Sequence, residues 1–187
     1  LSKTTFDTTL RMDQHSVFGE KITGRMTASY QPSQSLLVKL GGGTGFRAPS
    51  LDEMYGQYNT NDPSYYKADA NGDFTVVYGN SALEPESSTS FDAGLYYSLD
   101  TLGTKLSASI FNIKVDKAIS YDSGDPNDWY DGSYKQLGTK SQRQGIDLQV
   151  DFTLDGGSKI GLSYTGVTDE KGKNVTNIPK HIFNLAA

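Results

Sequence analysis

The side chains of this sequence that could do chemistry are its two histidines, its aspartates and its 12 tyrosines. Serine, aspartate and histidine all occur, but at no spacing that is typical of a nucleophile with its base. GxSxG, HExxH and P-loop patterns are also missing. The sequence therefore predicts no enzyme, and we expect solvated or structural roles for His15 and His181.

Acidic residues gather in two short stretches. Asp69, Asn71 and Asp73 match the first half of a calcium-binding loop, in which alternate side-chain oxygens turn toward the cation. The second half is missing, because residues 74–78 (FTVVY) have the pattern of a strand instead of leading to a bidentate glutamate. The other stretch, between Asp122 and Asp131, is typical of a solvated loop tip. We therefore expect no bound metal and no cofactor.

Aromatic residues are concentrated in two polar stretches between the predicted strands. Such side chains can stack on a planar or sugar-like ligand with a large contact area and little loss of entropy. They can equally pack one loop on another, or lie in an aromatic belt. The candidate ligand-binding residues are Tyr55, Tyr58, Tyr65, Tyr66, Trp129 and Tyr130.

Composition limits the class of protein. The chain of 187 residues carries 17 basic and 22 acidic side chains, and its net charge of −5 argues against nucleic acid as a partner. It has no cysteine, so neither disulfides nor thiolate metal sites are expected. The longest dense apolar run is residues 36–38, which excludes a membrane-spanning helix. A β-barrel needs only every second strand residue to be apolar, so it is not excluded.

Apolar and polar residues alternate with period two, which predicts β-strands with one oily and one polar side. In residues 144–154, for example, Ile146, Leu148 and Val150 share one side, and Asp147 and Gln149 the other. About eight strands are predicted, and the fold class is all-β and antiparallel. Their ranges are 5–12, 22–31, 35–45, 90–99, 105–115, 144–154, 160–165 and 180–187.

Two further features concern strand 105–115 and the connections. The apolar residues of that strand switch sides, from Leu106 and Ile110 to Phe111 and Ile113, which a β-bulge or emergence from an apolar layer would explain. Short turns at 32–34, 100–103 and 155–157 alternate with long connections at 13–21, 47–87, 116–140 and 167–179. Outer-membrane barrels have this asymmetry, although a soluble barrel or sandwich can also have unequal loops.

Three sequence blocks occur in order with a variable loop between them. They are residues 43–51 (GTGFRAPSL), 79–86 (GNSALEPE) and 90–95 (SFDAGL), with further matches at 10–19, 145–148 and 178–181. Together they resemble the barrel of a TonB-dependent outer-membrane receptor, nearest to the branch for cobalamin, colicins or catecholate siderophores. The resembling residues that we expect to be structural are Phe46, Arg47, Pro49, Asn80, Pro85 and Glu86. Arg47 and Glu86 lie at neighbouring strand ends in this topology, so we expect them to pair.

The resemblance implies a transmembrane up-and-down barrel in the outer membrane of a Gram-negative-type bacterium, in contact with lipid. It also implies binding of a ferric siderophore or cobalamin and import energised by TonB. Polar residues such as Asp92, Asp147, Gln149 and Asp151 would face the lumen and a plug domain. Haem is disfavoured, because residues 48–79 contain no histidine.

The sequence also departs from that family. The resemblance implies a barrel of 22 strands around a plug domain. Residues 1–187, in contrast, predict about eight strands, no plug and no closing C-terminal strand. We therefore expect a partial barrel domain whose open strand edges favour self-association. The alternative is a soluble or surface-displayed β-sheet module used for adhesion or binding.

Overall fold

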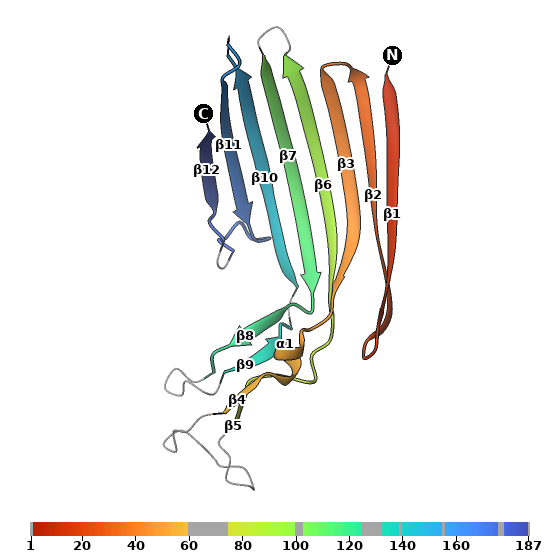
Figure 1. The fold of residues 1–187 in the computed structure, drawn as a ribbon, viewed down its shortest axis with the longest axis vertical. Helices are drawn as coiled ribbons and strands as arrows, with labels where there is room; N and C mark the ends of the chain where they lie inside the picture. The colour runs from red at the N-terminus through yellow and green to blue at the C-terminus, as the bar shows by residue number, and fades with distance from the viewer. Residues whose placement is uncertain are drawn as a thin grey trace.

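The computed structural model describes residues 2–59, 75–99, 103–124, 132–138, 140–154, 156–175 and 178–186. Eight strands form one antiparallel sheet in the order β1-β2-β3-β6-β7-β10-β11-β12 (Figure 1). They are β1 (Lys3–His15), β2 (Gly19–Ser33), β3 (Leu36–Arg47), β6 (Glu86–Leu99), β7 (Thr104–Asp116), β10 (Ser141–Thr153), β11 (Lys159–Thr168) and β12 (His181–Ala186). This confirms the eight predicted strands, most of which extend a few residues beyond their predicted ends.

Smaller elements gather at one end of this sheet, below the long strands in Figure 1. They are the helix α1 (Leu51–Tyr55) and the short strands β4 (Gln57–Asn59), β5 (Thr75–Val77), β8 (Ile119–Asp122) and β9 (Ser133–Gln136). β4 pairs with β5, and β8 pairs with β9. Apart from the stretch around β5, the sequence pattern did not predict these elements, because they are too short to show periodicity.

The two ends of the sheet carry different kinds of connection. The β2-to-β3, β6-to-β7 and β10-to-β11 connections lie at one end, and α1, β4, β5, β8 and β9 belong to the connections at the other (Figure 1). The predicted alternation of short and long connections is therefore confirmed from β2 onward. The predicted long connection at 13–21 is wrong, since β1 and β2 pair up to His15 and Gly19 and leave only a tight turn.

Register gives the sheet two chemically different faces. Val38 pairs with Leu95, Leu95 with Ala108, and Ala108 with Leu148, which in turn pairs with Tyr164. Paired residues in a sheet share a face, so these apolar side chains form a continuous band across β3, β6, β7, β10 and β11. We call this side the apolar face. Asp92, Asp147, Gln149 and Asp151 lie on the opposite, polar face, as the alternation predicted.

Strand β7 keeps its register along its whole length. Its pairs with β6 and β10 run without a shift from Thr104 to Val115, which excludes the β-bulge, one of the two explanations left open by the sequence. Phe111 and Ile113 therefore turn toward the polar face while Leu106 and Ile110 belong to the apolar face. The remaining explanation, emergence of the strand from an apolar layer, agrees with this geometry.

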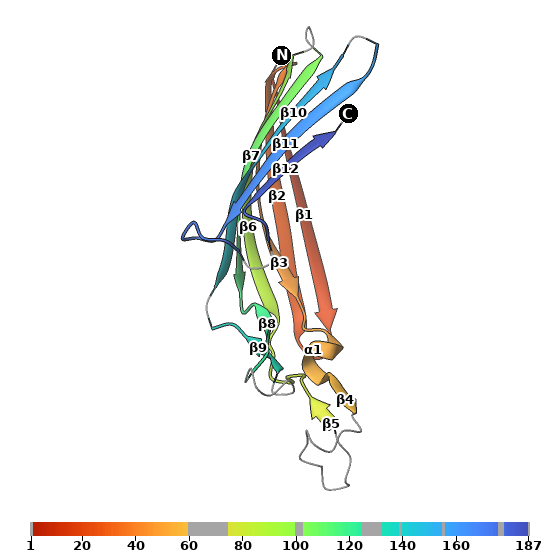
Figure 2. The same cartoon turned by 90° about the vertical axis from the view of Figure 1, so that its left-hand side faces the viewer.

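The sheet is a single curved layer (Figure 2). Large apolar side chains on the apolar face are accordingly exposed, with 76% of Leu10 and 75% of Phe183 accessible. Besides Pro49, the buried apolar side chains among the described residues are Met54, Leu83 and Val167, and Met54 and Leu83 lie in the connection that contains α1. No helix in the described part of the chain is long and apolar enough to cross a membrane.

Candidate functional site at the loop end of the sheet

The site is built around Arg47, the last residue of β3. Its Nε donates to Oε2 of Glu86 at 2.6 Å, and its Nη1 donates to Oε2 and Oε1 of Glu53 at 2.8 and 3.1 Å. Glu86 is the first residue of β6, and its Oε1 accepts the backbone N–H of Ile119 at 2.7 Å. One guanidinium therefore connects β3, α1 and β6, and through Glu86 also β8. The predicted pairing of Arg47 with Glu86 is confirmed.

Glu53 reaches Arg47 because α1 begins directly after the strand. The Ser50 side chain accepts the N–H of Glu53 at 3.1 Å, and Oε2 of Glu53 accepts the N–H of Ser50 at 2.7 Å, which is a capping box. Pro49 precedes it and is buried. The sequence analysis missed Glu53, although a serine followed three residues later by glutamate is a known signal for a helix start.

The segment from Gly79 to Glu86 folds against this short helix. The N–H of Asn80 donates to the carbonyl of Glu53 at 2.8 Å, and those of Tyr78 and Gly79 donate to the carbonyl of Gly56 at 3.0 and 2.9 Å. A Cβ at Gly79 would lie 2.4 Å from the backbone nitrogen of Gly56, so this close approach requires glycine. The block 79–86 is thus shaped by its contact with α1.

The same segment also contacts the next long connection. Tyr134 in β9 donates its N–H to the carbonyl of Tyr78 at 3.0 Å. Its backbone carbonyl accepts a hydrogen bond from Nδ2 of Asn80 at 3.0 Å. Two residues further on, the Gln136 side chain bonds both backbone groups of Glu84, accepting its N–H at 3.0 Å and donating to its carbonyl at 2.8 Å. The two connections, residues 48–85 and 117–140, are therefore joined.

The remaining residues of the predicted structural set line a groove. Phe46 and Pro85 border a hollow of about 430 Å³ between β2, β3 and β6, and Lys21 and Lys117 also line it. The backbone pairing of β2 with β3 extends only to Arg25 and Gly43 on this side, beyond which the hydroxyl of Thr44 accepts the N–H of Gly24. The groove lies where these strands separate.

The predicted ligand-binding aromatics are only partly described. Tyr55 ends α1 and is 55% exposed. Tyr58 lies in β4, and Tyr65, Tyr66, Trp129 and Tyr130 lie outside the described residues. Three other aromatic residues of these connections pack loop on loop, because the ring of Tyr134 lies 6.2 Å from that of Tyr78 and 5.2 Å from that of Tyr121.

Hydrogen bonds shift the proton affinities of this site. The bonds from Arg47 lower the pKa of Glu53 below its usual value, and the N–H of Ser50 acts in the same direction. The bond from Lys135 likewise lowers the pKa of Asp122. The pKa of Tyr78 is raised, because its hydroxyl donates to Asp52 at 2.7 Å. At neutral pH the site therefore holds ionised carboxylates and a neutral phenol.

The polar face carries its own ion pair. Arg25 in β2 reaches across β3 to Asp92 in β6, with Nη2 and Oδ1 2.5 Å apart. Gly41 lies between them, and a Cβ there would come within 2.6 Å of both side chains. Nearby on the same face, the hydroxyl of Thr165 donates to Asp147 at 2.7 Å. These contacts give the polar face a hydrogen-bonded surface.

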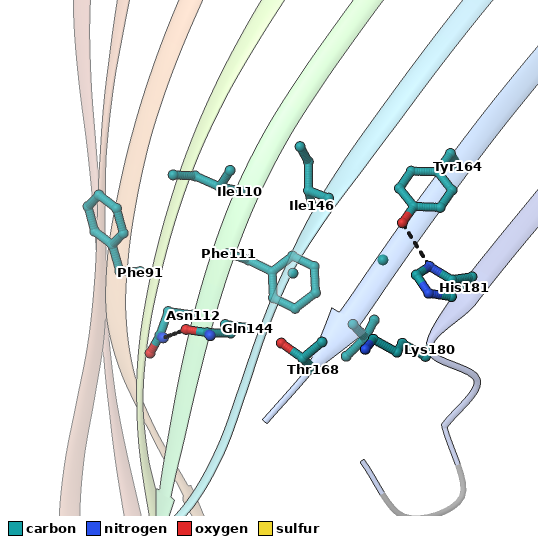
Figure 3. A pocket seen from close by; sticks show the side chains of 13 residues that line it. Phe91, Ile110, Phe111, Asn112, Gln144, Ile146, Tyr164, Thr168, Lys180 and His181 are labelled. Carbon is teal, nitrogen blue, oxygen red and sulfur yellow. Dashed lines mark hydrogen bonds between the residues drawn. The ribbon is translucent and has the colours of Figure 1, made fainter. Parts of the chain in front are cut away.

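A polar row ends the apolar face toward the loops. Asn112 pairs with Gln144, and Gln144 with Thr168, directly beyond the pair Ile110 and Ile146. Figure 3 shows Asn112 and Gln144 hydrogen-bonded beside a hollow of about 430 Å³ on β7, β10 and β11. The Arg47 cluster lies on the loop side of this row.

Both histidines make local contacts. Nδ1 of His181 lies 2.9 Å from the hydroxyl of Tyr164 at the edge of the hollow (Figure 3). His181 starts β12, while His15 ends β1 and its Nδ1 accepts the N–H of Val17 at 3.1 Å. No cluster of metal-ligating side chains occurs among the described residues, and the half calcium loop at 69–73 lies outside them.

Known proteins resemble this chain over nearly its whole length. A family model described as TonB dependent receptor-like, beta-barrel matches residues 1–187. The vitamin B12 transporter BtuB of Vibrio cholerae is 25% identical over 182 residues, which cover 97% of this chain and 25% of the relative. The iron-regulated outer membrane virulence protein of Vibrio cholerae is also 25% identical, over 93% of this chain and 27% of the relative. The chain thus spans about a quarter of the length of these relatives.

Solved structures agree on the fold. A variant of the ferric enterobactin receptor PfeA from Pseudomonas aeruginosa superposes with a TM-score of 0.71, at 20% identity, over 97% of this chain and 28% of that chain. The siderophore receptor PirA from the same organism gives 0.69 at 20% identity, over 89% of this chain and 31% of that chain. The expected barrel-wall fold and outer-membrane localisation are confirmed, and the sheet is not closed within the described residues. The chain belongs to the TonB-dependent receptor β-barrel family.

Proposed function

We propose that this chain is part of the barrel domain of a longer receptor, which binds a ferric siderophore or cobalamin and imports it with TonB-coupled energy. The family consists of receptors and transporters rather than enzymes, and we propose no covalent chemistry for this chain. Its partners would be outer-membrane lipid along the apolar face, a plug domain and TonB on the inner side, and the nutrient at the loop end.

The observation that carries this proposal is the exposed apolar face beside a polar one in strands of membrane-crossing length. β1, β2 and β3 contain 13, 15 and 12 residues, more than the roughly 9–11 that a tilted strand needs to cross a bilayer. A soluble module would cover the side chains of Leu10 and Phe183, which are exposed. No comparison supports the alternative of an adhesion module.

The two joined connections, which lie beyond the polar row, support the proposal that the ligand binds at the loop end of the sheet. They present Tyr55 and Tyr121, which are 55% and 50% exposed, outside the apolar band. Exposed aromatic rings on a fixed support suit a planar ligand, because little side-chain freedom is lost on binding. The predicted Trp129 and Tyr130 belong to the same connection as Tyr121.

A binding measurement on the complete receptor tests this proposal. We expect saturable binding of vitamin B12 or ferric enterobactin to the receptor in detergent, measured by calorimetry. Trp129→Ala should weaken that binding about 5- to 20-fold, because a buried aromatic contact is lost. Tyr30→Ala on the apolar face is the matched control and should bind as the unchanged receptor does. Failure of a panel of ferric siderophores and cobalamins to bind would overturn the proposal.

A further inference from the structure

Two side-chain amides join the long connections at the loop end in a reciprocal way. Asn80, from the first connection, donates to the backbone carbonyl of Tyr134 in the second at 3.0 Å. Gln136, from the second, accepts the N–H of Glu84 in the first at 3.0 Å and donates to its carbonyl at 2.8 Å. The Gln136 amide bonds both backbone groups of Glu84, as the peptide groups of a strand partner would, whereas Asn80 makes one bond across. We call these two residues with their backbone partners the amide clasp.

Gln136 makes the larger contribution to this clasp. Its Nε2 also donates to the carbonyl of Lys117 at 2.6 Å, at the start of its own connection. Lys117 has a φ of 57°, a left-handed conformation that is uncommon for residues other than glycine and needs support from its surroundings. Its ammonium also forms an ion pair with Glu84. Gln136 thus holds the strained exit of β7 and the entry to β6 together.

The clasp is anchored to the sheet on both sides. Pro85 and Glu86 follow Glu84 directly, and Glu86 bonds Arg47 of β3 and the N–H of Ile119. The N–H of Asn80 donates to the backbone carbonyl of Glu53, whose side chain completes the capping box of α1 and bonds Arg47. Displacement of one connection relative to the other would therefore break the hydrogen bonds that join them. This is the condition for the two to move as one body.

We propose that the amide clasp couples the described parts of the two long connections into a single body, with Gln136 as the positioning residue that sets the ligand surface formed there. The ligand part of this inference rests on the proposed function. The coupling part stands on the described contacts alone, and an exchange measurement tests it without any ligand.

The test uses the complete receptor and hydrogen exchange of its backbone amides. Gln136→Leu removes three hydrogen bonds, so peptides from 78–86 should exchange about tenfold faster although the substitution lies in the other connection. Amides of β6 from Phe91 to Leu95 should be unchanged, which shows that the sheet is folded. Gln142→Leu, in β10 close to the same connection, is the matched control and should leave 78–86 unchanged. Unchanged exchange in Gln136→Leu would overturn the coupling.

A second variant separates coupling from general damage. In Gln136→Glu the ionised carboxylate faces the carbonyls of Glu84 and Lys117 and the carboxylate of Glu84, with only the Lys117 ammonium in compensation. Once protonated, it offers one donor and one acceptor, so it can restore the bond from the N–H of Glu84 and one of the two bonds to the carbonyls. Relative to the unchanged receptor, exchange at 78–86 should be fast at pH 7 and approach normal near pH 4. The same excess at both pH values would contradict the clasp geometry.

Ligand binding then tests the positioning role. Vitamin B12 and ferric enterobactin serve as probes, and the affinity of Gln136→Leu for whichever binds should fall about tenfold because the competent loop arrangement is less populated. Normal affinity despite faster exchange at 78–86 would overturn the positioning role and keep the coupling. If the unchanged receptor binds neither probe but 78–86 responds as expected, the coupling is supported and the proposed ligand classes are the part that fails.

Discussion

Arg47 shows how one residue can serve several elements at once. Its guanidinium has two edges, and the structure uses them for Glu86 and Glu53 separately. Arg47 is 46% exposed, whereas the two carboxylates are 16% and 14% exposed, so the acids are the groups that depend on this contact. The structural role of Arg47, Pro49 and Glu86 stays a prediction, and the bond between Arg47 and Glu86 is the contact that such a role requires.

The lowered pKa of Glu53 leads to a prediction about acid. A carboxylate whose pKa is lower in the folded state stabilises the fold above its unfolded pKa, and this contribution is lost as pH falls through the folded pKa. We expect amides of α1 to exchange faster, relative to the β6 strand, once the pH drops below the usual pKa of glutamate. Glu53→Gln should remove this pH dependence and destabilise α1 by about 1 kcal/mol or less, since Arg47 is half exposed.

Hydrogen exchange between pH 7 and pH 3 measures the effect. Glu20→Gln at the β1-to-β2 turn is the control and should retain the acid response of α1. A response of the same size in Glu53→Gln would assign it to other carboxylates and contradict the prediction.

At the scale of elements, glycines allow neighbouring strands to approach or to be bridged. In β10, a Cβ at Gly145 would lie 2.4 Å from the carbonyl oxygen of Gly166 in β11 and 2.5 Å from the ring of Phe111. In β3, a Cβ at Gly41 would meet only the ends of the Arg25 and Asp92 side chains, which can move. Gly42 has room, because its nearest neighbour would be 3.6 Å away.

These distances predict an order of stabilities for alanine variants. Gly145→Ala should destabilise the folded receptor by about 1–3 kcal/mol, because backbone and a ring must shift. Gly41→Ala should cost less and act mainly by displacing the ion pair, and Gly42→Ala should be close to neutral. Urea unfolding in detergent, followed by tryptophan fluorescence, gives the three values. Equal losses at Gly42 and Gly145 would contradict this explanation.

For the whole molecule, the important property is that one sheet has an apolar face, a polar face and two edge strands without a second partner among the described strands. β1 and β12 end the sheet, and β1 pairs only with β2 and β12 only with β11 among the described strands. Unpaired edges and an exposed apolar face both promote association in water. In a longer receptor, neighbouring strands and lipid would cover them.

The isolated 187-residue chain should therefore depend on amphiphile. We expect it to self-associate or aggregate in buffer without detergent and to bind a dye for apolar surfaces strongly. Size-exclusion chromatography with light scattering, with and without detergent, measures this. The complete receptor in detergent is the comparison. A monodisperse monomer in plain buffer with little dye binding would contradict the wall geometry and favour the adhesion module.

The sequence by itself determined the eight strands of the large sheet, their two faces and the resemblance to the family. Period-two alternation is local, so Ile146 and Asp147 reveal opposite faces without knowledge of their partners. The same pattern could not tell a bulge from a continuous β7, because that depends on the register with β6 and β10.

Only the tertiary structure decided how the loop end is held together. Gln136 lies 52 positions from Glu84, and Asn80 lies 54 positions from Tyr134. Loop residues have no periodicity that would predict such partners, and α1 is one short turn between a strand and a variable segment. Glu53 was readable from its capping box, but its bond to Arg47 was not, since it depends on where the chain re-enters after Pro49. Long-range hydrogen bonds of this kind depend on which distant segments the tertiary fold brings together. No local sequence pattern encodes that.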